Sequence, residues 1–67
     1  MIILTKLDGI EFVLNCDLIE TVMESPDTTI HLTNGHYYIV RESMEEVIEK
    51  TVEYHRRIFG DAIRGNY

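Results

Sequence analysis

Apolar and polar residues alternate with a period of two over most of the chain up to Val40, and from Ser43 onward they follow a helical period. The first pattern predicts β-strands and the second predicts an α-helix. Two dipeptides, Asp8-Gly9 and Asn34-Gly35, each stand between two alternating runs. Asp or Asn followed by Gly favours a two-residue hairpin loop in which both residues take positive φ. The pattern therefore predicts two tight β-hairpins and one helix.

The predicted loops also set which residues face each other across each hairpin. With two-residue loops, Leu4 lies opposite Val13 and Ile30 lies opposite Ile39. This register and the apolar stripe of the helix define the predicted core, which consists of Leu7, Ile10, Phe12, Leu14, Ile30, Leu32, Ile48 and Ile58. The far side of the sheet is more apolar than a solvated face requires. We therefore expect a candidate interaction face made of Ile2, Leu4, Val13, Val22 and Tyr38.

A further strand is predicted from Leu18 to Glu24, followed by a proline turn that leads into the second hairpin. Ser43 is the predicted N-cap residue of the helix, because Glu46 stands at the position that completes a capping box. The helix should end near Phe59, with Gly60 in a left-handed conformation after it. The predicted fold class is α+β: a five-stranded antiparallel β-meander followed by one C-terminal helix packed on the sheet. Residues 1–60 form the predicted domain and residues 61–67 a short tail.

Composition narrows the possible environments and partners. The chain has 67 residues and one cysteine, so it cannot form a disulfide within itself, and a reducing cytoplasm suits it best. Its N-terminus has no basic lead followed by a long apolar stretch, so we expect no signal peptide and no membrane insertion. Twelve acidic residues against six basic ones leave a net charge of −6, which disfavours binding to nucleic acid.

Few residues are candidates for chemistry. His31 and His36 fall on one face of the second hairpin, where Glu20 or Glu24 could supply a third metal ligand, but solvated histidines are the more common reason for such a pattern. Cys16 has no neighbouring base or helix N-terminus that would activate it as a nucleophile. The sequence therefore predicts no catalytic residue, no metal site and no cofactor.

Five short segments resemble one known family in their order and spacing. They are D-G at Asp8-Gly9, N-x-D-L-I-E from Asn15 to Glu20, S-P-D-T from Ser25 to Thr28, N-G at Asn34-Gly35 and E-S-x-E-E-V from Glu42 to Val47. Together they are similar to the FlbD family of small flagellar proteins, also called SwrD, from Ile2 to about Ile58. The resemblance implies a cytoplasmic, non-enzymatic accessory of flagellar motility that supports motor power through the stators. It transfers no site residue.

The leading hypothesis is a module that acts through protein–protein interaction, with flagellar motor or assembly proteins as partners. We also expect a homo-oligomer, because so short a chain gains from burying additional apolar surface. The alternative is a small regulatory nucleic-acid-binding protein, because strands followed by a single helix also occur in small DNA-binding domains. A sheet with aromatic residues such as Tyr37 and Tyr38 is also similar to base-stacking surfaces. Nothing in the sequence supports an enzyme.

Overall fold

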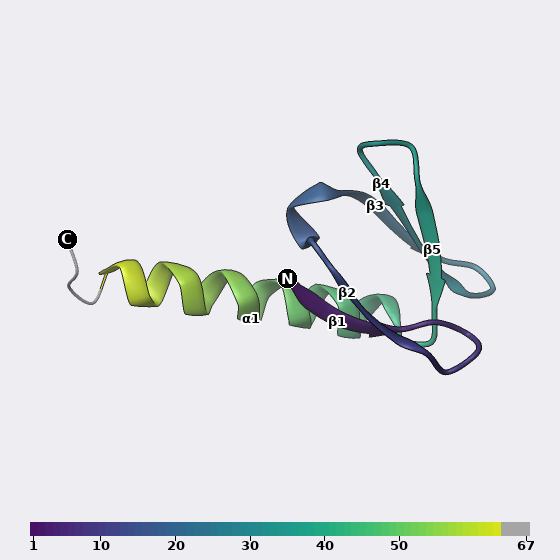
Figure 1. Cartoon of the computed structure of the whole chain (residues 1–67), viewed down its shortest axis with the longest axis horizontal. Helices are drawn as coiled ribbons and strands as arrows, with labels where there is room; N and C mark the ends of the chain where they lie inside the picture. The colour runs from purple at the N-terminus through teal and green to yellow at the C-terminus, as the bar shows by residue number, and fades with distance from the viewer. Residues whose placement is uncertain (64–67) are drawn as a thin grey trace.

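The structure, a computed structural model, describes the backbone of residues 1–63 and the side chains of residues 1–58. It contains five antiparallel strands and one long helix (Figure 1), which confirms the predicted α+β class. In chain order the elements are β1 (Ile2–Thr5), β2 (Glu11–Leu14), a 3₁₀ turn η1 (Cys16–Leu18), β3 (Ile19–Glu24), β4 (Thr28–Leu32), β5 (Tyr37–Val40) and α1 (Met44–Ile63).

The strands divide between two sheets that are joined at one end. β1 and β2 form a two-stranded sheet, and β3, β4 and β5 form a three-stranded sheet in that order. A bridge between Lys6 and Val40 connects the two sheets, and the Arg41 N–H donates to the Thr5 carbonyl at 2.8 Å. The Arg41 guanidinium also donates to the Leu7 carbonyl, with its Nη2 at 2.7 Å. The first hairpin is thus fastened to the end of β5 by backbone and side chain together.

The first hairpin loop is one residue longer than predicted. The Lys6 N–H donates to the Ile10 carbonyl at 2.9 Å, and the Gly9 N–H donates to the Lys6 carbonyl at 2.9 Å, so Leu7, Asp8 and Gly9 make up the loop. Gly9 has a φ of 92°, whereas no residue other than glycine has a positive φ among those described. A type I turn followed by a left-handed glycine has this form, while the predicted loop would need positive φ at Asp8 as well.

The second hairpin repeats the same loop. The Leu32 N–H donates to the His36 carbonyl at 2.8 Å, the Gly35 N–H donates to the Leu32 carbonyl at 3.1 Å, and Gly35 has a φ of 90°. The side chain before each glycine completes the turn, because the Asn34 amide oxygen accepts from the His36 N–H and the Asp8 carboxylate accepts from the Ile10 N–H. Both dipeptides therefore mark hairpins as predicted, but with a different loop.

The longer loop shifts the register of each hairpin by one residue. Leu4 pairs with Phe12 where Val13 was expected, and Ile30 pairs with Tyr38 where Ile39 was expected. Since strand side chains alternate between faces, a shift of one residue moves one strand's side chains to the opposite face. The buried apolar residues are Ile2, Leu4, Leu14, Cys16, Ile30, Leu32, Val40 and Val47.

The predicted core is therefore correct only in part. Leu14, Ile30 and Leu32 are buried as predicted, and Phe12 is half-buried against the core. The prediction is wrong for Leu7, Ile10, Ile48 and Ile58, all of which are exposed. Leu7 and Ile10 lie in and beside the first hairpin loop. Ile48 follows the buried Val47 on α1 but is itself 49% exposed, and Ile58 lies further along the helix, past the half-buried His55.

An irregularity in β3 places two apolar residues on the core side. Ile19 pairs with Leu32 and Thr21 pairs with His31, so the register shifts between Ile19 and Thr21. A bulge of this kind reverses the alternation of side chains along the strand. Ile19 and Val22 consequently both pack against the core, although uninterrupted alternation placed them on opposite faces.

The helix begins where the sequence predicts. The Glu46 N–H donates to Ser43 Oγ at 3.1 Å and the Ser43 N–H donates to Glu46 Oε1 at 3.1 Å, which is the reciprocal capping box. The helix does not end at Phe59 but continues through Gly60 to Ile63. A glycine inside a helix costs about 1 kcal/mol relative to alanine, which is too little to end a helix by itself. The predicted tail of residues 61–67 thus begins within α1, and its part from residue 64 lies outside the described residues.

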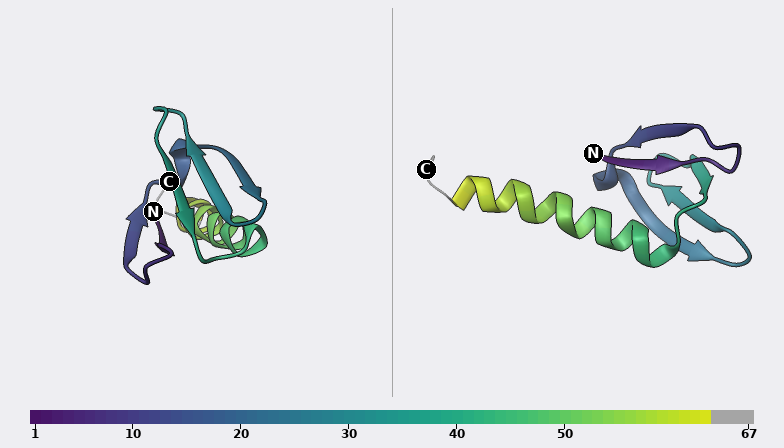
Figure 2. Two further views of the ribbon diagram at one scale, coloured as in Figure 1. Left: turned by 90° about the vertical axis from the view of Figure 1, so that its right-hand side faces the viewer. Right: turned by 90° about the horizontal axis from the view of Figure 1, so that it is seen from below.

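Only the first part of α1 packs on the strands. Figure 2 shows that the helix runs under the two sheets and then extends well past them. Val47 is 1% exposed, and Thr51, Tyr54 and His55 are half-buried. The helix therefore uses one edge of its apolar stripe to close the core and leaves the rest of that stripe uncovered.

Candidate functional site

An apolar groove separates α1 from β3. Its volume is about 240 Å³, and it is lined by Cys16, Ile19, Val22, Val47, Ile48, Thr51 and Val52. β3 is also an edge strand of its sheet, so no further strand within the described part of the chain pairs with it on this side. The groove is thus a concave apolar surface beside an open strand edge, a combination that suits binding of another polypeptide.

An exposed apolar row runs along the helix side of the groove, and two of its residues, Ile48 and Val52, line the groove itself. Met44, Ile48 and Val52 recur every four residues and so lie on one side of α1, with exposed fractions of 38%, 49% and 47%. Single exposed apolar residues are ordinary on protein surfaces, but a contiguous row beside a groove is typical of a binding surface.

Carboxylates flank this row. Glu45 precedes Ile48 by three residues and Glu49 precedes Val52 by three residues, so each carboxylate neighbours one apolar side chain on the helix surface. At the start of the row, Glu24 Oε1 accepts from the Met44 N–H at 2.8 Å. The groove therefore combines apolar contact with a negatively charged border.

The observed hairpin register changes where the five residues of the predicted interaction face lie. Ile2 and Leu4 are 5% and 0% exposed, so the prediction that they form an outer face is wrong. Tyr38 is half-buried, with its ring centroid 4.9 Å from that of Phe12. Val22 is half-buried and lines the groove, whereas Val13 is 63% exposed. The five residues therefore do not share one surface.

The outer side of the sheets still carries exposed apolar residues, but different ones. Ile3 lies directly opposite Val13, and Ile3 is 54% exposed. On the three-stranded sheet, Met23, Tyr37 and Ile39 are exposed at 57%, 60% and 37%. The shift in the first hairpin that buries Ile2 and Leu4 exposes Ile3, and the corresponding shift in the second hairpin accounts for Tyr37 and Ile39, whereas Met23 lies on β3 outside both hairpins.

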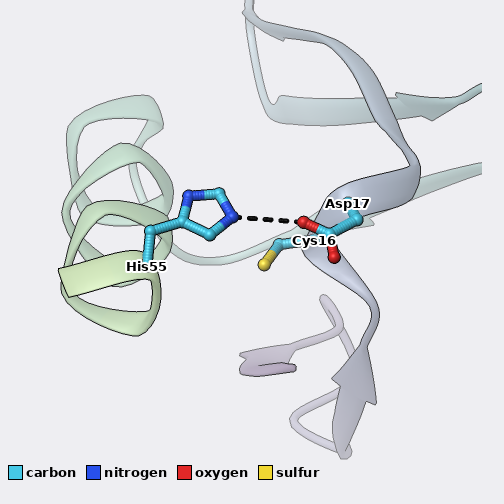
Figure 3. Close-up of side chains that lie close together, drawn as sticks. All are labelled: Cys16, Asp17 and His55. Atoms are coloured by element: carbon cyan, nitrogen blue, oxygen red, sulfur yellow. Dashed lines mark hydrogen bonds and ion pairs between the residues drawn. The ribbon is translucent and has the colours of Figure 1, made fainter. Parts of the chain in front are cut away.

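A polar cluster lies where η1 meets α1. Figure 3 shows the His55 ring directed toward Asp17, with the Cys16 sulfur beside them; His55 Nε2 is 3.1 Å from Asp17 Oδ1. The potential ligand atoms of Cys16, Asp17 and His55 all lie within 4.8 Å of one another. Cys16 is buried, while the other two side chains reach solvent. The fold thus assembles a thiol, a carboxylate and an imidazole that the sequence separates.

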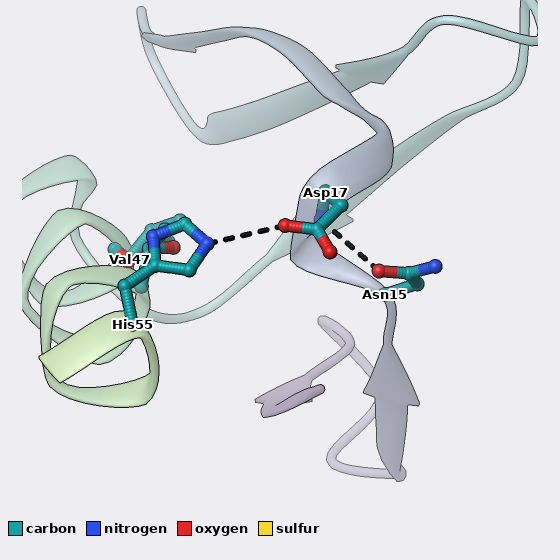
Figure 4. Close-up of polar contacts among 5 residues, drawn as sticks. Asn15, Asp17, Val47 and His55 are labelled. Carbon is teal, nitrogen blue, oxygen red and sulfur yellow. Dashed lines mark hydrogen bonds and ion pairs between the residues drawn. The ribbon is translucent and has the colours of Figure 1, made fainter. Parts of the chain in front are cut away.

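The backbone of η1 holds its half of the cluster in place. The Asp17 N–H donates to Asn15 Oδ1 at 3.1 Å (Figure 4), and the Leu18 N–H donates to the Asn15 carbonyl at 3.1 Å. The Thr33 N–H also donates to the Leu18 carbonyl at 2.8 Å, which ties η1 to the end of β4. These hydrogen bonds therefore hold the turn that carries Cys16 and Asp17 in a fixed conformation.

The histidines singled out by the sequence do not take part in this cluster. His31 is exposed on β4, with its ring 5.8 Å from that of Tyr37, and His36 follows the second hairpin loop. Among the described residues, the group of Cys16, Asp17 and His55 is the one whose potential ligand atoms come together. Sequence reasoning missed it because Asp17 and His55 are 38 positions apart, and no local motif links them.

The surroundings of the Glu42 carboxylate shift its pKa. Partial burial acts to raise the pKa of Glu42, but hydrogen bonds from Thr5 outweigh it, and a weaker attraction to Lys50 acts in the same direction. Glu42 Oε1 accepts from the Thr5 N–H at 2.9 Å and Oε2 accepts from Thr5 Oγ1 at 2.8 Å. The pKa of Glu42 consequently lies below its ordinary value. The contact joins β1 to the segment before α1, so it serves the fold.

Taken together, the fold and its surfaces define a small α+β protein with an apolar groove and, where η1 meets α1, a cluster of a thiol, a carboxylate and an imidazole. Within the described residues, no helix is both long enough and apolar enough to cross a membrane. The chain belongs to the FlbD family of flagellar and swarming motility proteins, whose family model matches residues 1–59. Comparison with curated proteins and with solved structures gave no match.

Proposed function

We propose that this protein is a non-enzymatic, cytoplasmic accessory of flagellar motility that binds another protein through the groove between β3 and α1. Its membership of a motility family supports the process, and the groove supports the mode of action. Support of motor power through the stators is the specific role that we propose within that process. The observation that carries the proposal is the exposed row Met44, Ile48 and Val52 beside an open strand edge.

The groove indicates the chemistry of its occupant. Its walls are apolar, while Glu45, Glu49 and Glu24 supply negative charge along its border. A complementary partner presents an amphipathic segment with apolar side chains at its centre and Lys or Arg beside them. Burial of the apolar row contributes the affinity, and the charges contribute orientation and association rate. We therefore propose a basic amphipathic segment of a flagellar motor or assembly protein as the occupant.

The matched exposed residues of the outer sheet face make a controlled experiment possible. The double variant Ile48→Ser/Val52→Ser changes the groove, and Met23→Ser/Ile39→Ser introduces serine at two exposed apolar residues on the outer face of the three-stranded sheet. Both variants should keep the core intact, which thermal unfolding verifies. In a deletion strain that has lost swarming, the outer-face variant should restore motility and the groove variant should not.

Three results would count against this proposal. If a deletion strain swims and swarms like its parent, the protein has no role in motility. Restoration of swarming by the groove variant, with failure of the outer-face variant, would move the binding site to the other side of the sheets. If light scattering shows a homo-oligomer that the groove variant dissociates, then a second copy of this chain is the occupant of the groove.

The alternative of nucleic-acid binding is less well supported. Besides the net charge of −6, the exposed guanidinium groups of Arg56 and Arg57 lie 3.4 Å and 3.9 Å from the Glu53 carboxylate, so they are partly neutralised. Retention on heparin that falls steeply with salt would favour this alternative.

A further inference from the structure

The cluster of Cys16, Asp17 and His55 is unlike an ordinary surface ion pair. An ion pair needs only Asp17 and His55, yet the Cys16 sulfur lies beside them, within 4.8 Å of both ligand atoms (Figure 3). The three groups come from two separate elements, η1 and α1, which meet only in the folded chain. We propose that these three side chains form a binding site for Zn²⁺.

The ligand types suit zinc better than other common divalent ions. Zinc binds thiolate, imidazole and carboxylate ligands together, whereas Mg²⁺ and Ca²⁺ take oxygen ligands. A thiolate and a carboxylate also neutralise the two positive charges of the ion, while imidazole binds as a neutral ligand. On binding, the Cys16 thiol loses its proton to solvent, and His55 binds through an unprotonated ring nitrogen.

The geometry requires little adjustment. With zinc–ligand bonds of about 2.0–2.2 Å and a tetrahedral arrangement, nitrogen and oxygen ligands stand about 3.3–3.6 Å apart. The His55 Nε2 to Asp17 Oδ1 distance of 3.1 Å is close to that range. The widest separation in the cluster, at most 4.8 Å, exceeds the tetrahedral spacing of a sulfur ligand by about 1 Å, which a rotation of side chains can close.

The surroundings provide both support and access. The Asn15 side chain and the Leu18 backbone brace η1, as metal sites require of the groups behind their ligands. The Asp17 and His55 side chains are 64% and 41% exposed, so an ion can reach them from solvent. Three protein ligands leave the fourth tetrahedral position open for water or for a ligand from a bound partner.

Zinc at this position would join η1 to α1. His55 lies on α1 three residues after Val52, which lines the groove. Cys16 lines the same groove from the opposite side. The ion would therefore hold the two walls of the groove at a defined separation. This site does not depend on the proposed motility function, since it concerns metal binding by the isolated chain.

Cobalt titration of the metal-free, full-length protein tests the site directly. Co²⁺ occupies zinc sites and gives a near-ultraviolet thiolate-to-metal absorption band when a cysteine is bound. We expect this band to saturate at one ion per chain and to disappear when Zn²⁺ is added. Asp17→Asn and His55→Gln should each weaken Zn²⁺ binding at least tenfold, and Cys16→Ser should abolish the band. His31→Gln and His36→Gln are the matched controls and should bind like the parent.

Thermal unfolding shows whether Zn²⁺ binds to the folded protein or only to the unfolded chain. Zn²⁺ should raise the unfolding midpoint of the parent and leave that of His55→Gln unchanged, because only an ion that prefers the folded state stabilises it. Asp17 is exposed and His55 is only half-buried, so their variants should fold even if Cys16→Ser does not. Absence of the band in the parent, or its persistence at parental strength in His55→Gln, would overturn the proposal.

Discussion

The hairpin register can be tested by a pair of truncations on neighbouring residues of β1. Leu4 is fully buried and Ile3 is 54% exposed, although a two-residue loop predicts the reverse arrangement. Replacing a buried leucine by alanine costs roughly 2–5 kcal/mol, because apolar transfer energy is lost and a cavity remains. We therefore expect Leu4→Ala to lower the free energy of unfolding by about 2–5 kcal/mol. Ile3→Ala should cost about 1 kcal/mol or less, the span of strand propensities at exposed positions.

The size of the domain makes this difference easy to measure. At about 0.05–0.15 kcal/mol per residue, a chain of 67 residues has a stability of roughly 3–10 kcal/mol. Leu4→Ala thus removes a large fraction of it, and Ile3→Ala a small one. Urea unfolding followed by circular dichroism gives both values from the transition midpoints and slopes. Equal losses in the two variants, or a larger loss for Ile3→Ala, would show that the assigned register and loop type are incorrect.

Three further predictions concern the turns, the helix start and acid stability. Gly35→Val should lower the free energy of unfolding by about 1–3 kcal/mol because Gly35 has a φ of 90°, while Gly35→Asn should lower it less. A Cβ at this position would meet no other group within 4 Å, so steric contact does not explain a loss. Equal losses for the two variants in urea unfolding would exclude backbone strain as the cause. Ser43→Ala should lose about 0.5–2 kcal/mol in the same assay, and no loss would mean that the capping box contributes nothing. Because the pKa of Glu42 is lower in the folded chain than in the unfolded one, its stabilising contribution is complete above its ordinary value of 4.5 and is lost as the pH falls through the folded value. Glu42→Gln should therefore lose less stability than the parent between neutral and acidic pH, and parallel pH profiles would contradict this.

The features that the sequence determines are those set by neighbouring residues. Asp8-Gly9 and Asn34-Gly35 mark hairpins because only glycine takes the left-handed conformation at low cost. Ser43 and Glu46 determine the start of α1, because their reciprocal hydrogen bonds satisfy backbone donors within one turn. The family was also recognisable from sequence, since its signature lies in short segments at fixed spacing.

Tertiary structure decided the hairpin loop type and the strand register, because local preferences favour the alternatives almost equally. A dipeptide such as Asn34-Gly35 fits either a two-residue loop or a type I turn with a following glycine, and the two differ by one residue in register. The choice depends on which side chains are buried on the sheet: the observed register buries Leu4 and Ile30 completely. The same holds for β3, where a bulge places Ile19 and Val22 on one side.

The candidate sites likewise depend on contacts between distant parts of the chain. The groove exists because α1 closes the core with Val47 and leaves Ile48 and Val52 exposed beside β3. Asp17 and His55 meet because the helix passes η1 at that point, 38 residues along the chain. Sequence pattern reports the period and the caps of each element, which are local properties. How an element is rotated against its neighbours is set by the packing of the whole core, and that rotation determines which side chains come together.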